Sequence, residues 1–343
     1  MKLYRQVLAA LEALPSVPQD LQIVEATGLV KQHYPSVSTD RAAFVGPLDQ
    51  DVLAPVCRRL LQAYPEDHAV VVIVQTDGEA SSKECTLDRA HCLELDGKPS
   101  LLYLPPLPCA GAVESFYDTV AHLRAPDGCP WDREQTHRSL RQGFQEEAHE
   151  VLDALDRGDL AALQEELGDV LLHILLQAQI ATENGEFRLK DIVCGVNEKI
   201  VYRHPHVFGG LDVDGVDEVL VNWEALKQAE KGKKKEAPSA LDGIALSMPA
   251  LARAQSIQRH VHGAGVLDGD IGLLRERIKA NLGQLVQLPD ADSRDRCLGE
   301  LLFDLAHLAR KLGIDAESAL RETNVRFEDW YRERESGIDI STG

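Results

Sequence analysis

Two short stretches of this sequence supply carboxylates at a spacing that suits metal chemistry. Their acidic residues are Glu146, Glu147 and Glu150 in the first stretch and Glu165, Glu166 and Asp169 in the second. Residues three or four apart share one face of a helix, which pairs Glu147 with Glu150. The same spacing pairs Glu166 with Asp169. If two such helices pack antiparallel, four carboxylates converge, and Mg²⁺ is a cation that favours carboxylate oxygens together with water and phosphates.

Amphipathic helices are needed to hold these carboxylates. Apolar periodicity and helix-end signals predict helices over residues 115–123, 140–155, 160–182, 189–202 and 219–231. Thr136 is the expected N-cap of the helix that carries the first stretch, and Gly158 with Asp159 should end that helix. The residues from 125 to 131 are expected to form a loop with a turn at Asp127 and Gly128. Helices joined by loops, with no strand signal, predict an all-α bundle for this part of the chain.

Four sequence motifs occur in order along this bundle. They are CPWDREQTH at 129–137, EExxE at 146–150, ExxD at 166–169 and KIVYRHPHVF at 199–208. Together they resemble the MazG family of nucleoside triphosphate pyrophosphohydrolases over roughly residues 113–230. The resemblance implies an all-α, Mg²⁺-dependent enzyme, with Mn²⁺ as a substitute, that usually forms a homodimer. It also implies hydrolysis of an NTP or dNTP to the monophosphate and pyrophosphate, with metal ligands at Glu147, Glu150, Glu166 and Asp169.

The chemistry of a phosphoanhydride supports that implication. Its cleavage requires neutralised charge on the phosphates and a positioned water. Lys199 and Arg203 are four apart and can share a face toward the phosphates, where the planar fork of Arg203 suits bidentate contact. Glu146 lies beside the ligands and is a candidate for orienting the water. Trp131 either borders the base or anchors its loop in the core, and the sequence leaves both open.

Other interpretations of the same residues compete with these. Glu146 and His149 have the spacing of di-iron helical bundles, but no second ExxH follows, which favours Mg²⁺. Lys199 and Arg203 could be ordinary surface charges, and Glu146 could be merely exposed. His204 and His206 flank a proline and are expected to cap or pack a turn. The alternative to an enzyme is a non-catalytic helical regulatory or interaction protein that retains the MazG motifs.

Residues 1–108 carry a different pattern. Apolar β-branched runs at 70–74 and 101–104 predict strands, the first ending at Asp77-Gly78, and residues 52–61 have helical periodicity. This predicts a small α/β domain. The stretches LQIVEATGLV, AYPEDHAVVVIVQ and LLYLPPL resemble the C-terminal half of the tetrapyrrole methylases, over roughly residues 20–108. The glycine-rich half of that family, which helps to bind S-adenosylmethionine, has no counterpart in the sequence, so we expect a structural remnant without methyltransferase activity.

Residues 240–343 resemble a second, degenerate MazG copy behind a charged linker at 231–239. LGELLFDLAHLAR at 298–310 echoes LGDVLLHILLQAQ at 167–179, and Asn324 with Arg326 echoes Asn197 with Lys199. The counterpart of EExxE is ANLGQ at 280–284, the counterpart of ExxD is Cys297-x-x-Glu300, and Trp330 replaces Arg203. The remaining carboxylate cannot hold two cations, so we expect this copy to pack or dimerise and the first copy to carry the activity.

Composition limits the partners and the compartment. A formal net charge of −20 argues against non-specific binding to nucleic acid or to an anionic membrane. Seven scattered cysteines without a CxxC pair suggest reduced thiols in the cytoplasm. The sequence shows neither a signal peptide after Met1 nor an apolar run long enough for a membrane span. The sequence therefore predicts a cytoplasmic nucleoside triphosphate pyrophosphohydrolase, with removal of non-standard or damaged nucleotides as a fitting role.

Overall fold

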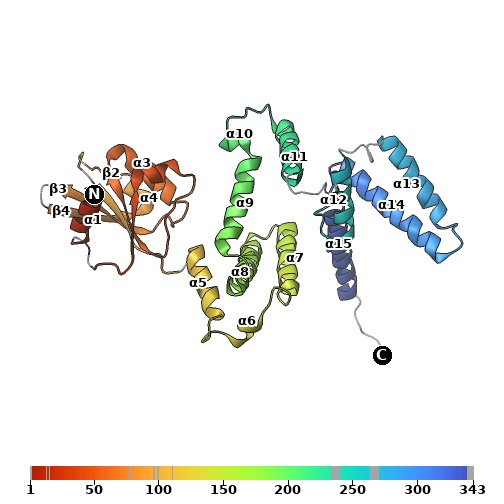
Figure 1. Cartoon of the computed structure of the whole chain (residues 1–343), viewed down its shortest axis with the longest axis horizontal. Helices are drawn as coiled ribbons and strands as arrows, with labels where there is room; N and C mark the ends of the chain where they lie inside the picture. Colours follow the sequence, from red (N-terminus) through yellow and green to blue (C-terminus); the bar gives the residue numbers. More distant parts are fainter. Residues whose placement is uncertain are drawn as a thin grey trace. The chain divides into compact units, whose positions relative to one another are not determined.

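The structure is a computed structural model. It describes residues 2–12, 14, 16–76, 79–95, 97–98, 100–109, 111–232, 239, 241–262 and 270–337. The turn expected at Asp77 and Gly78, and most of the linker expected at 231–239, lie outside these residues. Helices make up most of the described chain, and a sheet lies near its N-terminal end (Figure 1). The chain divides into two compact units, residues 1–155 with 159–192 and residues 156–158 with 193–343.

The first unit begins with a mixed sheet. Its strands are β1 (Leu21–Glu25), β2 (Ala42–Leu48), β3 (Ala69–Thr76), β4 (Glu79–Thr86) and β5 (Ser100–Leu104). Their order in the sheet is β1-β2-β5-β3-β4. β1 and β2 run parallel, and the other neighbouring pairs are antiparallel. Because β5 pairs between β2 and β3, the sheet depends on contacts between residues far apart in the chain.

Helices cover both faces of this sheet. They are α1 (Lys2–Leu11), α2 (Ala26–Lys31), α3 (Gln50–Leu60) and α4 (Leu87–Ala90). Successive strand residues point to opposite faces, so Val70 and Val72 pack with α2, α3 and α4 in the larger core. Ile73 faces the other way and packs with Val7 and Ala10 of α1. The α/β prediction for this segment is confirmed, although the sequence did not predict β1, β2 or β4.

Four helices follow in the same unit. They are α5 (Val113–Leu123), α6 (Pro130–Glu134), α7 (Arg141–Arg157) and α8 (Leu160–Asn184). Val120 of α5 and Leu140 lie in a core with Leu175 and Leu176 of α8. Burial of these side chains therefore holds α5 and the turn just before α7 against α8.

The boundary between α7 and α8 follows from two adjacent residues. Gly158 has a φ of +67°, a left-handed conformation that a glycine adopts without strain. The carboxylate of Asp159 then accepts hydrogen bonds from the amides of Ala161 and Ala162, both at 3.1 Å, and caps α8. The prediction that the helix ends at these two residues is confirmed. Gly158 provides the turn between α7 and α8, and Asp159 starts α8.

The prediction of a loop over residues 125–131 is partly wrong. The turn around Asp127 is present, but α6 begins at Pro130. Proline suits the first turn of a helix because its missing N–H would have no partner there. Trp131 therefore lies on a short helix. The prediction of Thr136 as the N-cap of α7 is wrong, because α7 begins only at Arg141. The Thr136 hydroxyl instead accepts from the amide of Ser139 at 3.1 Å and caps the turn before α7.

The remaining helices belong mainly to the second unit. α9 (Leu189–Arg203) begins in the first unit and continues into the second, where α10 (Pro205–Phe208), α11 (Val216–Gly232), α12 (Ala250–His262), α13 (Ile271–Leu285), α14 (Ala291–Lys311) and α15 (Ala316–Gly337) follow. The buried amide of Gln255 on α12 donates to the carbonyls of Ala306 and Ile314 and accepts from the amide of Ala316. It thereby fixes α12 to the connection between α14 and α15.

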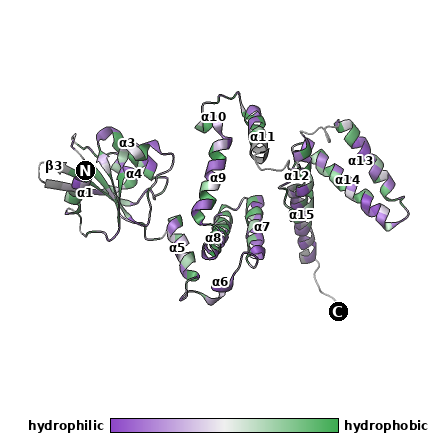
Figure 2. Ribbon diagram, viewed as in Figure 1, coloured by the Kyte–Doolittle hydropathy of each residue, from purple (hydrophilic) through white to green (hydrophobic). Residues whose placement is uncertain are grey.

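Polar and apolar residues are interspersed along these helices (Figure 2). Among the described residues, no helix is both long and apolar enough to cross a membrane.

Candidate active site

Carboxylates from α7 and α8 meet in the first unit. Glu147, Glu150 and Glu166 each offer an oxygen, and these oxygens all lie within 4.8 Å of one another. Glu150 forms a hydrogen bond with Glu166. Among the charged neighbours of Glu147, Asp169 has the strongest effect on it. Glu147 is thus paired with Asp169 and Glu150 with Glu166, so α7 and α8 run antiparallel, as expected from the sequence.

The electrostatics of this group are unfavourable without a counter-charge. The pKa of Glu147 is raised, first by partial desolvation and then by the negative charges of Asp169 and Glu150. The pKa of Glu166 is raised by desolvation and then by the charge and the hydrogen bond of Glu150. The negative charges around them therefore make Glu147 and Glu166 harder to ionise, and a divalent cation at this group would relieve that repulsion.

Asp169 lies beside this group of three without belonging to it. Its charge reaches Glu147 and raises the pKa of that residue, and its own side chain is half-buried. The structure therefore brings three of the four sequence-predicted ligands within 4.8 Å, with the fourth as a close neighbour.

Glu146 and Trp131 are both solvent-exposed. An oxygen of Glu146 accepts a hydrogen bond from the side-chain amide of Gln142 at 2.8 Å, one turn earlier on α7. Trp131 is 66% exposed, so it does not anchor its loop in the core of the first unit. Of the two interpretations left open by the sequence, the structure excludes the core anchor for Trp131.

Arg124 holds the Trp131 segment in place instead. Its side chain is only 6% exposed and pairs with the carboxylate of Glu183 on α8, with an Nη2–Oε2 distance of 2.7 Å. Its other terminal nitrogen donates to the backbone carbonyls of Asp132 and Gln135, the latter at 3.2 Å. One guanidinium thus joins the end of α5, the short helix α6 and the C-terminal half of α8.

His137 fixes the other end of the same segment. Its Nδ1 contacts the side-chain oxygen of Gln177, and its Nε2 lies 2.9 Å from a carboxylate oxygen of Glu186. Both partner atoms are acceptors, so the doubly protonated, positively charged form of the imidazole can donate to both of them. The hydrogen bond to Gln177, followed by that to Glu186, accordingly raises the pKa of His137.

Comparison with known proteins assigns a family to this arrangement. Residues 135–208 match the MazG nucleotide pyrophosphohydrolase domain, a range that contains both acidic stretches. The nucleoside triphosphate pyrophosphohydrolase of Escherichia coli K12 is 36% identical over 246 residues, which are 67% of this chain and 93% of the relative. The chain belongs to the MazG family. It is thereby placed among the nucleoside triphosphate pyrophosphohydrolases, which are hydrolases acting on acid anhydrides, as the four motifs predicted.

Two further relatives show how far the likeness extends. The MazG nucleoside triphosphate pyrophosphohydrolase/pyrophosphatase of Thermotoga maritima is 38% identical over 226 residues, 66% of this chain and 86% of the relative. The protein YabN of Bacillus subtilis is 33% identical over 311 residues, 85% of this chain. This chain spans 62% of the length of YabN. The YabN match is longer than the helical part of this MazG chain, so it takes in part of the α/β segment.

The basic residues of the KIVYRHPHVF motif lie on the part of α9 that belongs to the second unit. Lys199 is exposed. Arg203 is half-buried, with its guanidinium carbon 5.5 Å from the centre of the Trp223 ring. His204 donates from Nδ1 to the carbonyl of Ile200 at 2.6 Å and also contacts Trp223. These contacts agree with the interpretation of His204 as a group that caps the end of α9.

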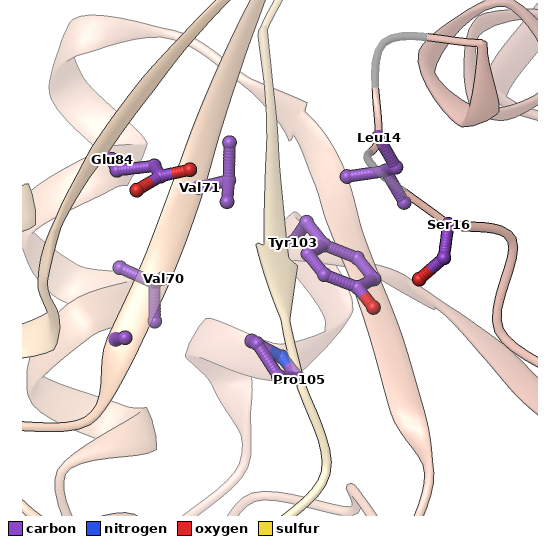
Figure 3. A pocket seen from close by; sticks show the side chains of 8 residues that line it. Leu14, Ser16, Val70, Val71, Glu84, Tyr103 and Pro105 are labelled. Atoms are coloured by element: carbon purple, nitrogen blue, oxygen red, sulfur yellow. The ribbon is translucent and has the colours of Figure 1, made fainter.

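The α/β segment of this MazG chain also contains a cavity of about 280 Å³ (Figure 3). Tyr103 lies at its centre, with Val71 on one side and Leu14 on the other. Among the described residues that line it, Glu84 is the single carboxylate, and neither histidine nor cysteine is present. The described lining therefore offers neither a cluster of metal ligands nor a nucleophile paired with a base.

Sequence analysis missed Arg124, Gln177, Glu183 and Glu186 as supports of the site. Arg124 and Glu183 are 59 residues apart, and neither belongs to a recognisable short motif. His137 closes the CPWDREQTH motif, so its presence was visible although its partners were not. The packing of α5 on α8 brings Arg124 to Glu183. Gln177 and Glu186 instead meet His137, in the turn before α7.

Proposed function

We propose that this chain is a Mg²⁺-dependent nucleoside triphosphate pyrophosphohydrolase whose cation site is formed by α7 and α8. The observation that carries the proposal is the set of carboxylate oxygens from Glu147, Glu150 and Glu166 within 4.8 Å. Oxygen ligands at this spacing suit a hard cation such as Mg²⁺, and Mn²⁺ fits the same donors. A bound cation would supply charge neutralisation for the triphosphate and a more acidic water. The reaction would yield the monophosphate and pyrophosphate.

The neighbouring residues have roles that follow from their position and chemistry. Asp169 completes the ligand set because it lies beside Glu147. Glu146 is the exposed chain neighbour of Glu147, and it would orient the attacking water through the oxygen that does not accept from Gln142. Lys199 and Arg203 are four apart on α9, and we propose that they bind the phosphates. Trp131 presents an exposed ring on α6, which suits stacking against a base.

The proposed domains are an α/β segment at 1–108, a catalytic MazG-like domain at 113–230 and a degenerate copy at 240–343. The contact between Cys297 and Asn281 supports the copy, because the thiol of Cys297 lies 3.4 Å from the carbonyl oxygen of Asn281. These two residues align with Glu166 and Glu147, which also meet across two helices. The copy would thus keep the helix pairing with a single carboxylate, Glu300, in place of four. We propose a packing role for it and a structural role for the methylase-like segment.

We also propose that the chain acts as a homodimer. Val193, Val196 and Ile200 are spaced three and four apart on α9 and are 39–55% exposed. They form an apolar stripe that a second copy could cover. The cytoplasm remains the proposed compartment, since the described structure shows all seven cysteines as free thiols.

Pyrophosphate release from a panel of standard and damaged nucleoside triphosphates tests the proposal. The assay is run with Mg²⁺, with Mn²⁺ and with a chelator. We expect release with either cation and none with the chelator, and the ranking of substrates gives the base preference. Absence of pyrophosphate release from every substrate with either cation would favour a non-catalytic helical protein and overturn the proposal.

A further inference from the structure

One helical turn from the carboxylates, α7 and α8 approach each other at a glycine and a histidine. Gly143 lies four residues before Glu147 on α7, and His173 lies four residues after Asp169 on α8. This pair continues the antiparallel register in which Glu147 faces Asp169 and Glu150 faces Glu166. The glycine and the histidine therefore form the layer next to the proposed cation site.

The space at Gly143 is filled by the ring of His173. A Cβ placed on Gly143 would lie 2.9 Å from Cε1 and 3.0 Å from Nε2 of the imidazole. Atoms in proteins do not approach a Cβ that closely, so even a methyl group would force the ring or a helix to move. The absence of a side chain at Gly143 is therefore a condition of the close approach.

The ring of His173 is confined on other sides as well. Phe144 packs edge-on against it, with ring centres 6.0 Å apart and an angle of 87° between the rings. Its Nδ1 is buried and has no hydrogen-bond partner among the described residues. A ring held by packing, without a hydrogen bond of its own at that atom, acts as a spacer between the helices.

We infer that the Gly143–His173 contact sets the separation of α7 and α8 at the carboxylates, so that both act as positioning residues. The consequence for cation binding rests on the proposed function. Mg²⁺ demands oxygens at about 2.0–2.1 Å in a nearly octahedral arrangement, and it tolerates displaced ligands poorly. A shift of α7 at Gly143 would move Glu147, one turn away, relative to Asp169.

The second unit has a different side-chain contact at the aligned positions. The alignment of ANLGQ with EExxE places Arg277 where the first copy has Gly143, and Asp304 where it has His173. These two residues form an ion pair, with an Nε–Oδ2 distance of 2.7 Å, and Asp304 is 4% exposed. A long side chain thus bridges α13 and α14 at this layer, where α7 has no side chain. The small residue belongs with the copy that has the carboxylates.

Variants that enlarge the residue at 143 and shrink the residue at 173 test the inference. The proteins compared are wild type, Gly143→Ala, His173→Ala, the double variant Gly143→Ala/His173→Ala, and the control Gly283→Ala. Gly283 is also a helical glycine, on α13, and a Cβ there meets nothing within 4 Å. Mg²⁺ binding is measured by calorimetry, pyrophosphate release is measured at saturating Mg²⁺, and melting temperatures are recorded with chelator.

We expect Gly143→Ala to bind Mg²⁺ about tenfold more weakly, the size of effect typical of residues behind metal ligands. Removing the ring in the double variant should restore binding to within about twofold of His173→Ala alone, and Gly283→Ala should bind like wild type. Wild-type affinity in Gly143→Ala, or no recovery in the double variant, would overturn the inference.

Failure of the proposed function gives a different result. It would appear as a wild type that neither binds Mg²⁺ nor releases pyrophosphate. In that case, the melts recorded with chelator still test whether the Gly143–His173 contact constrains the two helices. Alanine favours helix over glycine, so Gly283→Ala should melt higher than wild type. Gly143→Ala should not melt higher than wild type, but the double variant should melt higher than His173→Ala. Additive shifts in melting temperature would overturn the inference whatever the activity.

Discussion

Individual carboxylates in this protein have unequal surroundings. Glu166 is half-buried and hydrogen-bonded to Glu150, whereas Glu165, its chain neighbour, is exposed. Glu150 is exposed and offers one oxygen to the group of three. A single residue at the centre of the cluster therefore affects both the repulsion among the carboxylates and their capacity to hold a cation.

Glu150→Gln tests whether Glu150 is a ligand of the proposed cation, because it replaces one carboxylate oxygen with an amide nitrogen. The substitution keeps the size of the side chain and removes one charge and one anionic ligand. We expect an unchanged circular dichroism spectrum and a loss of pyrophosphate release greater than the roughly 10–100-fold typical of residues behind the ligands. Glu165→Gln is the charge-matched control and should retain activity. Wild-type turnover in Glu150→Gln would contradict the assignment of Glu150 as a ligand.

His137 provides a pH-dependent prediction. Its pKa in the folded protein is raised, above all by the hydrogen bond to Gln177 and then by Glu186. Stability from the charged ring is therefore fully present below its unfolded pKa of about 6.5 and is lost as the pH rises through the folded pKa. The difference in melting temperature between wild type and His137→Ala should be larger near pH 5.5 than near pH 8.5.

The exposed His149 supplies the control for that experiment. His149→Ala removes a histidine that contacts neither Gln177 nor Glu186, so it should leave the pH dependence due to those two contacts in place. An equal pH dependence for both variants would contradict the role of the contacts around His137.

At the scale of elements, local sequence signals predicted the helices that carry the site. Apolar spacing and the Gly158–Asp159 pair were sufficient to place α7 and α8, since both signals act within a few residues. Strand β2 was missed because its AAFVGPL sequence contains a Gly-Pro pair and lacks alternation, and its burial comes from pairing with distant β5. The anchoring of α6 could not be predicted, because Arg124 meets Glu183 only after α5 packs on α8.

Arg124→Lys tests that anchoring. Lysine keeps the charge but cannot make the forked contact with Glu183 and also reach two carbonyls. We expect the substitution to destabilise the protein by about 1.5–3 kcal/mol, the range for hydrogen bonds to charged groups, and to speed proteolysis between residues 125 and 135. Arg133→Lys is the control, because Arg133 is exposed and donates to the carbonyl of Pro126. Equal stability of the two variants would show that Arg124 does not hold α6.

At the scale of the whole chain, the sequence predicted an α/β segment followed by helices, and both are present. The proposed division into one competent and one degenerate MazG copy rests on aligned positions whose carboxylates differ. Only the residues of the first copy bring three carboxylates within 4.8 Å in the described structure. The chemistry should therefore survive without the second copy.

A chain shortened after Gly232 tests this division. We expect it to retain pyrophosphate release if its circular dichroism shows a folded protein. The truncation also removes Arg321, which pairs with Asp156 at the end of α7 at 2.5 Å. Full-length Arg321→Ala therefore serves as the control for loss of that ion pair. A folded but inactive short chain, beside an active Arg321→Ala, would show that the second copy contributes to catalysis.

The central claim is that the carboxylates of α7 and α8 form a cation site, and thermal melts test it most directly. Mg²⁺ binds the folded site and hardly the unfolded chain, so a free concentration about 100 times the dissociation constant adds about 2.7 kcal/mol to the free energy of unfolding. The melts compare wild type with Glu147→Gln/Asp169→Asn, each with Mg²⁺ and with chelator. The account predicts a rise of a few degrees in wild type, no rise in the double variant, and a metal-free double variant at least as stable as wild type because repulsion is removed. A wild type without a Mg²⁺-dependent rise, or an equal rise in both proteins, would contradict the account.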